Sequence, residues 1–289
     1  MAQTPEVAQI AIDGFATEML TWGERGKPGL LLLHGNGAHA GWWRFIAPFF
    51  ANDFRVAAFS WAGMGGSEHR PSYSIGGFVD QLLAVGDAAG LFDAPVPPVV
   101  VGHSFGGFPM MAMAGRHGAR FGGAVIVDTP FRAPGEAGGR PPSRPERAHR
   151  IYPSLDAALA RFRLAPGQSC ANLFIADDIA RGSLVAVSTP AETGWTWAFD
   201  PYLWSRFEVG DARTLLTTPQ CPVALIWGER SALMPPVAVA AMRALLPAGS
   251  PAFAIPDADH HVMIDQPLAF VAALRGLLSG WPQPTGVAT

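Results

Sequence analysis

The segment Gly102-His103-Ser104-Phe105-Gly106 constrains the fold of this chain more than any other. It directly follows the apolar run 97–101 and directly precedes a segment with the pattern of a helix. A serine between two glycines in a strand–turn–helix context stands on a strained turn, where larger side chains would clash. This turn lifts the hydroxyl group out of the sheet and directs the next amides and the helix N-terminus toward the reacting group. We therefore predict that Ser104 is a nucleophile.

Short apolar runs alternate with helix-like segments on both sides of this turn. This pattern is typical of β–α units around a parallel sheet, and continuous apolar runs are typical of strands covered on both faces. The expected strands are residues 7–12, 15–22, 30–34, 55–60, 99–103, 124–128, 223–227 and 252–255, and the main expected helices are 75–89, 105–117, 237–246 and 267–278. The sequence thus predicts an α/β fold with a mostly parallel sheet of about eight strands.

Residues 131–153 interrupt this rhythm, because they are rich in proline, glycine and arginine. A stretch that carries several aromatic residues follows, and the α/β rhythm resumes after about residue 216. We expect a helical cap at 131–216, inserted into a core formed by 1–130 and 217–289. A length of 289 residues fits this arrangement as well as it fits two small domains.

Composition limits the partners and the location of the protein. The chain is 49% hydrophobic, and its net charge of -3 gives no electrostatic reason to propose nucleic acid or an anionic membrane as partner. The N-terminus lacks the pattern of a secretory signal, and no apolar run approaches the ~20 residues of a membrane helix. Cys170 and Cys221 have neither metal-ligand spacing nor a disulfide framework. We expect a cytoplasmic protein without a membrane span, and the sequence is also compatible with a homodimer.

A second chemical signal lies in residues 30–43, where an apolar strand runs into a loop of small residues beginning His34-Gly35. The backbone N–H groups of such a loop can reach a developing negative charge at ~3 Å, whereas bulky side chains would block that approach. We expect the N–H groups of Asn36 and Phe105 to form an oxyanion hole. Gly37 is an alternative to Asn36.

Two adjacent histidines, His260 and His261, lie between the last short strand and the last helix. A loop at this place overhangs the carboxyl edge of the sheet, where ligands bind in open α/β folds. An imidazole pKa near neutrality suits proton transfer from a serine, and either histidine could serve. No pair of histidines has zinc-site spacing with a nearby carboxylate, so we expect no metal, and we expect no other cofactor.

The glycine-rich loop, the turn at Ser104 and the late histidine, in this chain order, resemble the α/β-hydrolase superfamily over nearly the whole chain. Residues 59–67, which read FSWAGMGGS, look like the loop after the fourth strand of that family. The family's catalytic histidine usually stands five residues before an acid that is followed by x-Pro. Counting back from Asp265 and Pro267 therefore selects His260. The resemblance implies an α/β-hydrolase fold with a lid and a catalytic triad.

The third member of the triad departs from the family pattern. The family usually places an aspartate after the seventh strand, where this chain has Ser231. Asp128 ends the sixth expected strand at the same edge of the sheet, and some members, including haloalkane dehalogenases and cofactor-free dioxygenases, take their acid from that place. We therefore expect a triad of Ser104, Asp128 and His260. Glu229 is the alternative acid, and a dyad without an acid stays open.

The resemblance implies a serine hydrolase that cleaves a small, apolar or aromatic carboxylic ester or lactone through an acyl-enzyme. Aromatic residues of the expected cap, such as Trp195 and Trp204, could contribute to an apolar pocket. A serine at the turn argues against epoxide hydrolase or dehalogenase chemistry, which needs an aspartate nucleophile. The alternatives are a carbon–carbon bond hydrolase, a cofactor-free oxygenase and, from a different class, a receptor with slow turnover.

Overall fold

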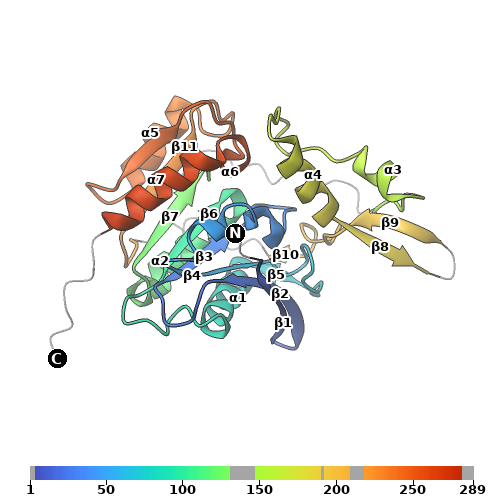
Figure 1. Cartoon of the computed structure of the whole chain (residues 1–289), viewed down its shortest axis with the longest axis horizontal. Coiled ribbons are helices and arrows are strands. Elements are labelled where there is room, and N and C mark those ends of the chain that lie inside the picture. The colour runs from blue at the N-terminus through green and yellow to red at the C-terminus, as the bar shows by residue number, and fades with distance from the viewer. Residues whose placement is uncertain (1–3, 131–146, 190–191, 209–217, 282–289) are drawn as a thin grey trace.

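The computed structural model describes residues 4–130, 147–189, 192–208 and 218–281, and its centre is an eight-stranded sheet in the order β1-β2-β4-β3-β6-β7-β11-β12 (Figure 1). The strands are β1 (Glu6–Ile12), β2 (Phe15–Trp22), β3 (Gly29–Leu33), β4 (Arg55–Phe59), β6 (Val99–His103), β7 (Gly123–Val127), β11 (Val223–Gly228) and β12 (Ala252–Ile255). β2 runs antiparallel to β1 and β4, and the other neighbours are parallel. The predicted mostly parallel sheet is confirmed.

Helices cover both faces of this sheet (Figure 1). They are α1 (Ile75–Ala88), α2 (Gly107–His117), α5 (Pro236–Leu245), α6 (Val262–Asp265) and α7 (Pro267–Ser279). Successive residues of a strand point to opposite faces, so each central strand feeds two cores. Leu31 and Leu33 of β3 pack with residues of α1 and α2, whereas Leu30 and Leu32 pack with residues of α6 and α7.

The carboxyl ends of the parallel strands lie together at one edge of the sheet. The chain passes from β3 to β4 on one side and returns to β6 on the other, so the strand order reverses between β3 and β6. In open α/β sheets, ligands bind outside the carboxyl ends at such a reversal. Ser104 follows β6 and Asp128 follows β7, which brings both to this edge.

The insertion between β7 and β11 is only partly helical. Its described residues form α3 (Leu155–Leu159), α4 (Leu173–Gly182), a hairpin of β8 (Leu184–Ser188) and β9 (Thr193–Trp197), and β10 (Phe207–Glu208), which pairs with β5 (Tyr73–Ser74) of the core. We expected a helical cap, and the described residues add a hairpin to its helices, because β-branched and aromatic residues concentrate in β8 and β9 and favour paired strands. The predicted boundaries at 131 and 216 lie outside the described residues, so that division stays a prediction.

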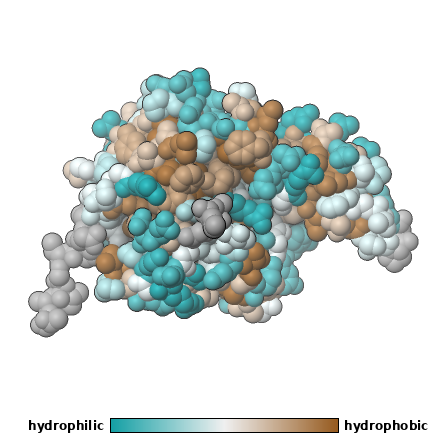
Figure 2. All heavy atoms as spheres, viewed as in Figure 1, coloured by the Kyte–Doolittle hydropathy of each residue, from teal (hydrophilic) through white to brown (hydrophobic). Residues whose placement is uncertain are grey.

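No helix in the described ranges is both long enough and apolar enough to cross a bilayer. Apolar side chains nevertheless reach the surface over both the sheet and the insertion (Figure 2). In the insertion they include Leu173 and Phe174 of α4 and Val185 of β8. Scattered exposed apolar residues of this kind are normal on globular proteins and need no partner to explain them.

Candidate active site

Ser104 stands on the strained turn that the sequence predicts. Its φ is 52°, in the left-handed region, and it begins a short 3-10 helix, η3 (Ser104–Gly106), that leads into α2. A Cβ atom on Gly102 would lie 2.8 Å from the Gly106 carbonyl oxygen, and one on Gly106 would lie 2.7 Å from that of His34. The Thr129 hydroxyl donates a hydrogen bond of 2.8 Å to the Ser104 carbonyl oxygen. Close packing and this bond together hold the serine in its unfavourable conformation.

A chain of hydrogen bonds joins Ser104, His260 and Asp128. Nε2 of His260 lies 3.0 Å from Ser104 Oγ, and Nδ1 lies 2.7 Å from Asp128 Oδ1. A carboxylate only accepts hydrogen bonds, so Nδ1 carries the proton and Nε2 is free to accept from the serine hydroxyl. Both His260 and Asp128 are buried. The three residues predicted as a triad thus have the geometry that lets imidazole take the serine proton.

Asp128 receives three hydrogen bonds although its side chain is fully buried. Its φ is 48°, directly after β7, and besides His260 its donors are the Ser231 hydroxyl at 2.7 Å and the Gly228 amide at 2.8 Å. A buried carboxylate needs such donors to stay ionised. Ser231 occupies the position where the family has its acid, and here it donates to the acid that follows β7. Sequence reasoning noticed this serine only as a departure and missed its role.

Glu229, the alternative acid, is not brought to His260. Its side chain is exposed, and its carboxylate accepts a hydrogen bond of 3.2 Å from the Asp257 amide. The backbone at the end of β11 directs the Gly228 amide inward to Asp128, and Glu229 lies on the outer side of this turn. The geometry therefore favours Asp128 over Glu229 as the partner of the imidazole.

The loop after β3 lies against the serine. A Cβ atom on Gly35 would come 3.1 Å from Ser104 Cβ and 3.5 Å from Ser104 Oγ, so any larger residue would press on the serine. The Gly35 carbonyl oxygen accepts a hydrogen bond from His34 Nδ1 of its own loop. Because the C=O and N–H of a trans peptide point in opposite directions, the Asn36 N–H points away from that bond.

The two amides predicted as oxyanion donors are available for a ligand. Phe105 lies in the first turn of η3, where a helical N–H has no partner within the helix. Within the described ranges, no backbone group accepts a hydrogen bond from the N–H of Phe105 or Asn36. Their role as an oxyanion hole stays a prediction. Gly37, whose φ is 67°, stays the alternative to Asn36 as a donor.

Two further histidines brace the site. Nε2 of His34 accepts a hydrogen bond of 3.0 Å from the Trp61 amide, and burial lowers the pKa of His34 to about 3, so the ring stays neutral and able to accept. This hydrogen bond braces the loop after β3 against the residue that follows Ser60. His39, in the same loop, is buried, and its Nε2 donates a hydrogen bond of 3.1 Å to the Ile179 carbonyl oxygen of α4.

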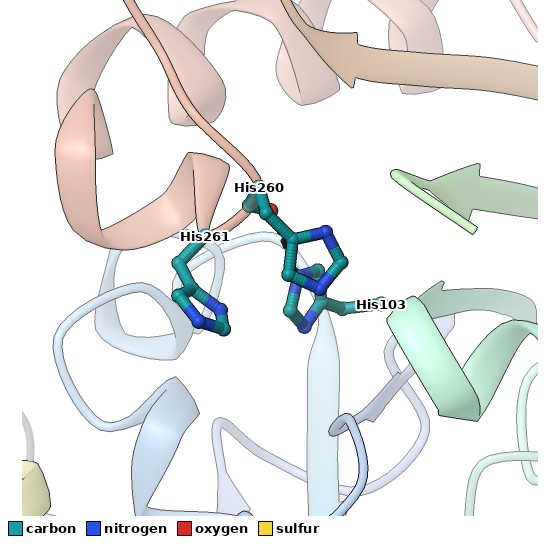
Figure 3. Close-up of side chains that lie close together, drawn as sticks. All are labelled: His103, His260 and His261. Carbon is teal, nitrogen blue, oxygen red and sulfur yellow. Dashed lines mark hydrogen bonds between the residues drawn. The ribbon is translucent and has the colours of Figure 1, made fainter. Parts of the chain in front are cut away.

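His103, His260 and His261 form a cluster in which one ring nitrogen of each lies within 4.8 Å of the others (Figure 3). Nε2 of His103 donates a hydrogen bond of 3.0 Å to the His260 carbonyl oxygen, since a carbonyl can only accept. Both ring nitrogens of His260 already bind Asp128 and Ser104. A metal ion held by this cluster would therefore displace a hydrogen bond of the triad geometry.

Stability should depend on pH through His261, whose pKa burial lowers to about 3, with neighbouring His260 adding to the effect. The unfolded chain binds a proton at His261 below about pH 6.5, whereas the folded chain does not until near its lower pKa, so stability falls as pH falls through this window. We expect His261→Phe to reduce the loss of unfolding free energy between about pH 7 and pH 5 by about 2 kcal/mol. Urea unfolding of the wild type and the variant at both pH values measures these free energies.

The control for this prediction is His69→Phe, because His69 is an exposed histidine outside the buried cluster. This variant should lose as much unfolding free energy between the two pH values as the wild type does. An equal loss in His261→Phe and the wild type would contradict the prediction.

The sheet order, the turn at Ser104 and the hydrogen bonds of its partners define an α/β-fold hydrolase. Residues 30–274 match the profile of the alpha/beta hydrolase family, and the chain belongs to that family. This result confirms the family resemblance read from the sequence.

Relatives with similar length are known by sequence and by structure. The chain is 28% identical over 251 residues to a pimeloyl-[acyl-carrier protein] methyl ester esterase of Chromobacterium violaceum, which covers 86% of this chain and 92% of that protein. A thioesterase domain from the curacin biosynthetic pathway superposes with a TM-score of 0.75 at 23% identity, over 96% of this chain and all of that one. An esterase from Mycobacterium tuberculosis superposes with a TM-score of 0.70 at 22% identity, over 96% of this chain and 92% of that one. The similarity to these two solved structures shows that this chain shares their fold.

Proposed function

We propose that this protein hydrolyses carboxylic esters through an acyl-enzyme formed on Ser104. The observation that carries the proposal is the unbroken hydrogen-bond chain from Ser104 Oγ through His260 to buried Asp128. A serine hydroxyl is a weak nucleophile by itself and needs a base in hydrogen-bond reach and a group that orients the base. All three roles have a residue here.

The mechanism proceeds in two halves. Ser104 Oγ attacks the ester carbonyl carbon while its proton passes to His260 Nε2, and the resulting imidazolium returns that proton to the alcohol as it leaves. Water then attacks the acyl-serine with His260 again as base, and the imidazolium returns the proton to Ser104 Oγ as the acid product leaves. The amides of Asn36 and Phe105 would hold the oxyanion in both halves, at about 3 kcal/mol for each donor. Asp128 holds the tautomer of His260 and stabilises its charged form.

An apolar acyl ester is the substrate class that the surroundings of the site support. In the insertion, which we propose is a cap over the site, the Trp204 ring packs edge-on against Phe105, the residue after the nucleophile, with centroids 5.7 Å apart. Trp204 is 40% exposed and so offers an apolar surface to a ligand. The named activities of the esterase and thioesterase relatives also concern acyl esters and thioesters.

Pre-steady-state kinetics with p-nitrophenyl esters of graded chain length, and with a matched set of lactones, tests the proposal. We expect a burst of p-nitrophenol close to one equivalent of enzyme, followed by many turnovers. A single slow turnover with tight retention of the ligand would favour a receptor instead. Selective opening of lactones would move the substrate class from open-chain esters to lactones.

A cofactor-free oxygenase is the second candidate, because some oxygenases of this superfamily also take their acid from the end of the corresponding strand, where Asp128 follows β7. Such an enzyme would not need an acylated serine. Labelling of Ser104 by a fluorophosphonate, without oxygen uptake during turnover, would rule against it. Oxygen uptake that persists in Ser104→Ala would favour it over the esterase.

A further inference from the structure

Two amide side chains of the insertion bind the loop that carries His260. Gln168 lies between α3 and α4, and Asn172 is the residue immediately before α4. Both are 92 or more residues away in sequence from the groups they bind. These contacts join the insertion to one of the loops that form the candidate active site.

Gln168 binds two residues that follow His260, and one of them binds the residue before it. Its Nε2 donates to both carboxylate oxygens of Asp265, at 2.9 Å each, and its Oε1 accepts a hydrogen bond of 3.1 Å from the His261 amide. The Asp265 carboxylate in turn accepts a hydrogen bond of 2.8 Å from the Asp259 amide. The backbone immediately before and immediately after His260 is thus held by one network that Gln168 completes.

Asn172 holds the other end of the same loop. Its Nδ2 donates to the carbonyl oxygens of Ile264 and Asp265, at 2.7 and 3.2 Å. These carbonyls close the short helix α6, and terminal carbonyls of a helix have no partner within it. The insertion therefore supplies hydrogen bonds that the loop cannot supply to itself.

Burial makes the contact with Asp265 sensitive to the position of the insertion. Desolvation raises the pKa of the Asp265 carboxyl, and the hydrogen bonds from the Asp259 amide and the Gln168 side chain act in the opposite direction. If the insertion moved away, the carboxylate would lose the Gln168 amide and keep the bond from Asp259. The His261 amide would also lose its acceptor, so the loop would lose the restraint on the residue that follows His260.

We propose that Gln168 is a positioning residue, which makes docking of the insertion a condition for aligning His260 with Ser104. The inference rests on the proposed function, since it assigns Gln168 a part in that same proton transfer. A misplacement of about 1 Å in a catalytic group can lower a rate about 100-fold. Loss of the bridge therefore affects the chemical step more than substrate binding.

The test reverses the polarity of the bridge. Gln168→Glu places two carboxylates in contact and breaks the bridge. Asp265→Asn sets a second N–H donor against the Gln168 amide and so removes one of the two bonds that Gln168 donates to this side chain. In the double variant, the new carboxylate at position 168 accepts from the new amide at position 265 and from His261 N–H. The amide oxygen at position 265 then accepts from Asp259 N–H. Each single variant should lower kcat about 10- to 100-fold with KM within about threefold, and the double variant should recover most of kcat.

The matched control is Gln9, an exposed glutamine that donates to the Gly66 carbonyl oxygen far from His260. Gln9→Glu should keep the wild-type kcat. Gln168→Ala, which removes the bridge without adding charge, should show the same loss confined to kcat if the glutamate variant folds poorly. Equal kcat in wild type, Gln168→Ala and Gln168→Glu, or a double variant as slow as its parents, would overturn the inference.

Hydrogen exchange of residues 256–266 gives a readout that is independent of turnover. Exchange in this segment should speed up in both single variants and return toward the wild-type rate in the double variant. If the variants show this pattern but the wild type hydrolyses no ester, the proposed function is overturned and the link between insertion and loop stands. Unchanged exchange in the single variants would overturn the link itself.

Discussion

Replacing Ser104 with alanine is expected to lower kcat for ester hydrolysis by about 10⁴-fold or more. The change removes the attacking oxygen and the hydrogen bond of 3.0 Å to His260 Nε2. It leaves the amides of Asn36 and Phe105 in place, so substrate should still bind and KM should change little. Steady-state kinetics on the ester that the wild type turns over fastest measures both constants.

The companion variants show whether the residues act as a unit. His260→Ala should be impaired to a similar extent, and Ser104→Ala/His260→Ala should be no slower than either single variant. The backbone bond from Thr129 to the Ser104 carbonyl survives the alanine substitution, so thermal stability should stay close to that of the wild type. Turnover by Ser104→Ala at the wild-type rate would contradict the acyl-enzyme.

The second large effect concerns the acid. Asp128→Asn should lower kcat about 10³- to 10⁴-fold, because an amide at this place can present its N–H group to His260 Nδ1 and select the wrong tautomer. The structure also suggests a second substitution that should restore part of the activity. Since the Ser231 hydroxyl lies 2.7 Å from the oxygen that binds His260, Asp128→Asn/Ser231→Asp puts a carboxylate near the same ring nitrogen. This double variant should recover about 10-fold or more of the lost rate.

The control for the acid is Glu229→Gln. Glu229 binds the Asp257 amide on the exposed side of the turn, so this change should leave kcat within about threefold of the wild type. A large loss in Glu229→Gln together with a normal rate in Asp128→Asn would overturn the assignment.

Local pattern predicted the core of the fold well. The buried strands are continuous apolar runs, as in β6 and β7, and the bounds of these two in the structure differ from the expected ones by a residue at most. The glycines on either side of Ser104 predicted the strained turn, and in the structure neither has room for a side chain. The insertion was predicted less well, because the choice between helix and hairpin in β8 and β9 depends on cross-strand pairing that sequence does not display.

The candidate site was predictable where one residue determines the geometry. Spacing from Asp265 selected His260 over His261, and the missing acid at Ser231 pointed to Asp128 at the neighbouring strand end. The second role of Ser231 and the bridge made by Gln168 were not predictable, because each joins segments about 90 residues or more apart through tertiary packing. One signal in the sequence pointed to the role of Ser231, namely a side chain able to donate a hydrogen bond at the position where the family has its acid.

The central claim is that Ser104 becomes acylated during turnover. The direct measurement is mass spectrometry of the wild-type enzyme, quenched in acid during the burst with a p-nitrophenyl ester and digested to peptides. The proposed mechanism predicts a transient mass increase equal to the acyl group on the peptide that contains Ser104, absent in Ser104→Ala. Sustained turnover without any acyl group on Ser104, or with the acyl group on another residue, would contradict it.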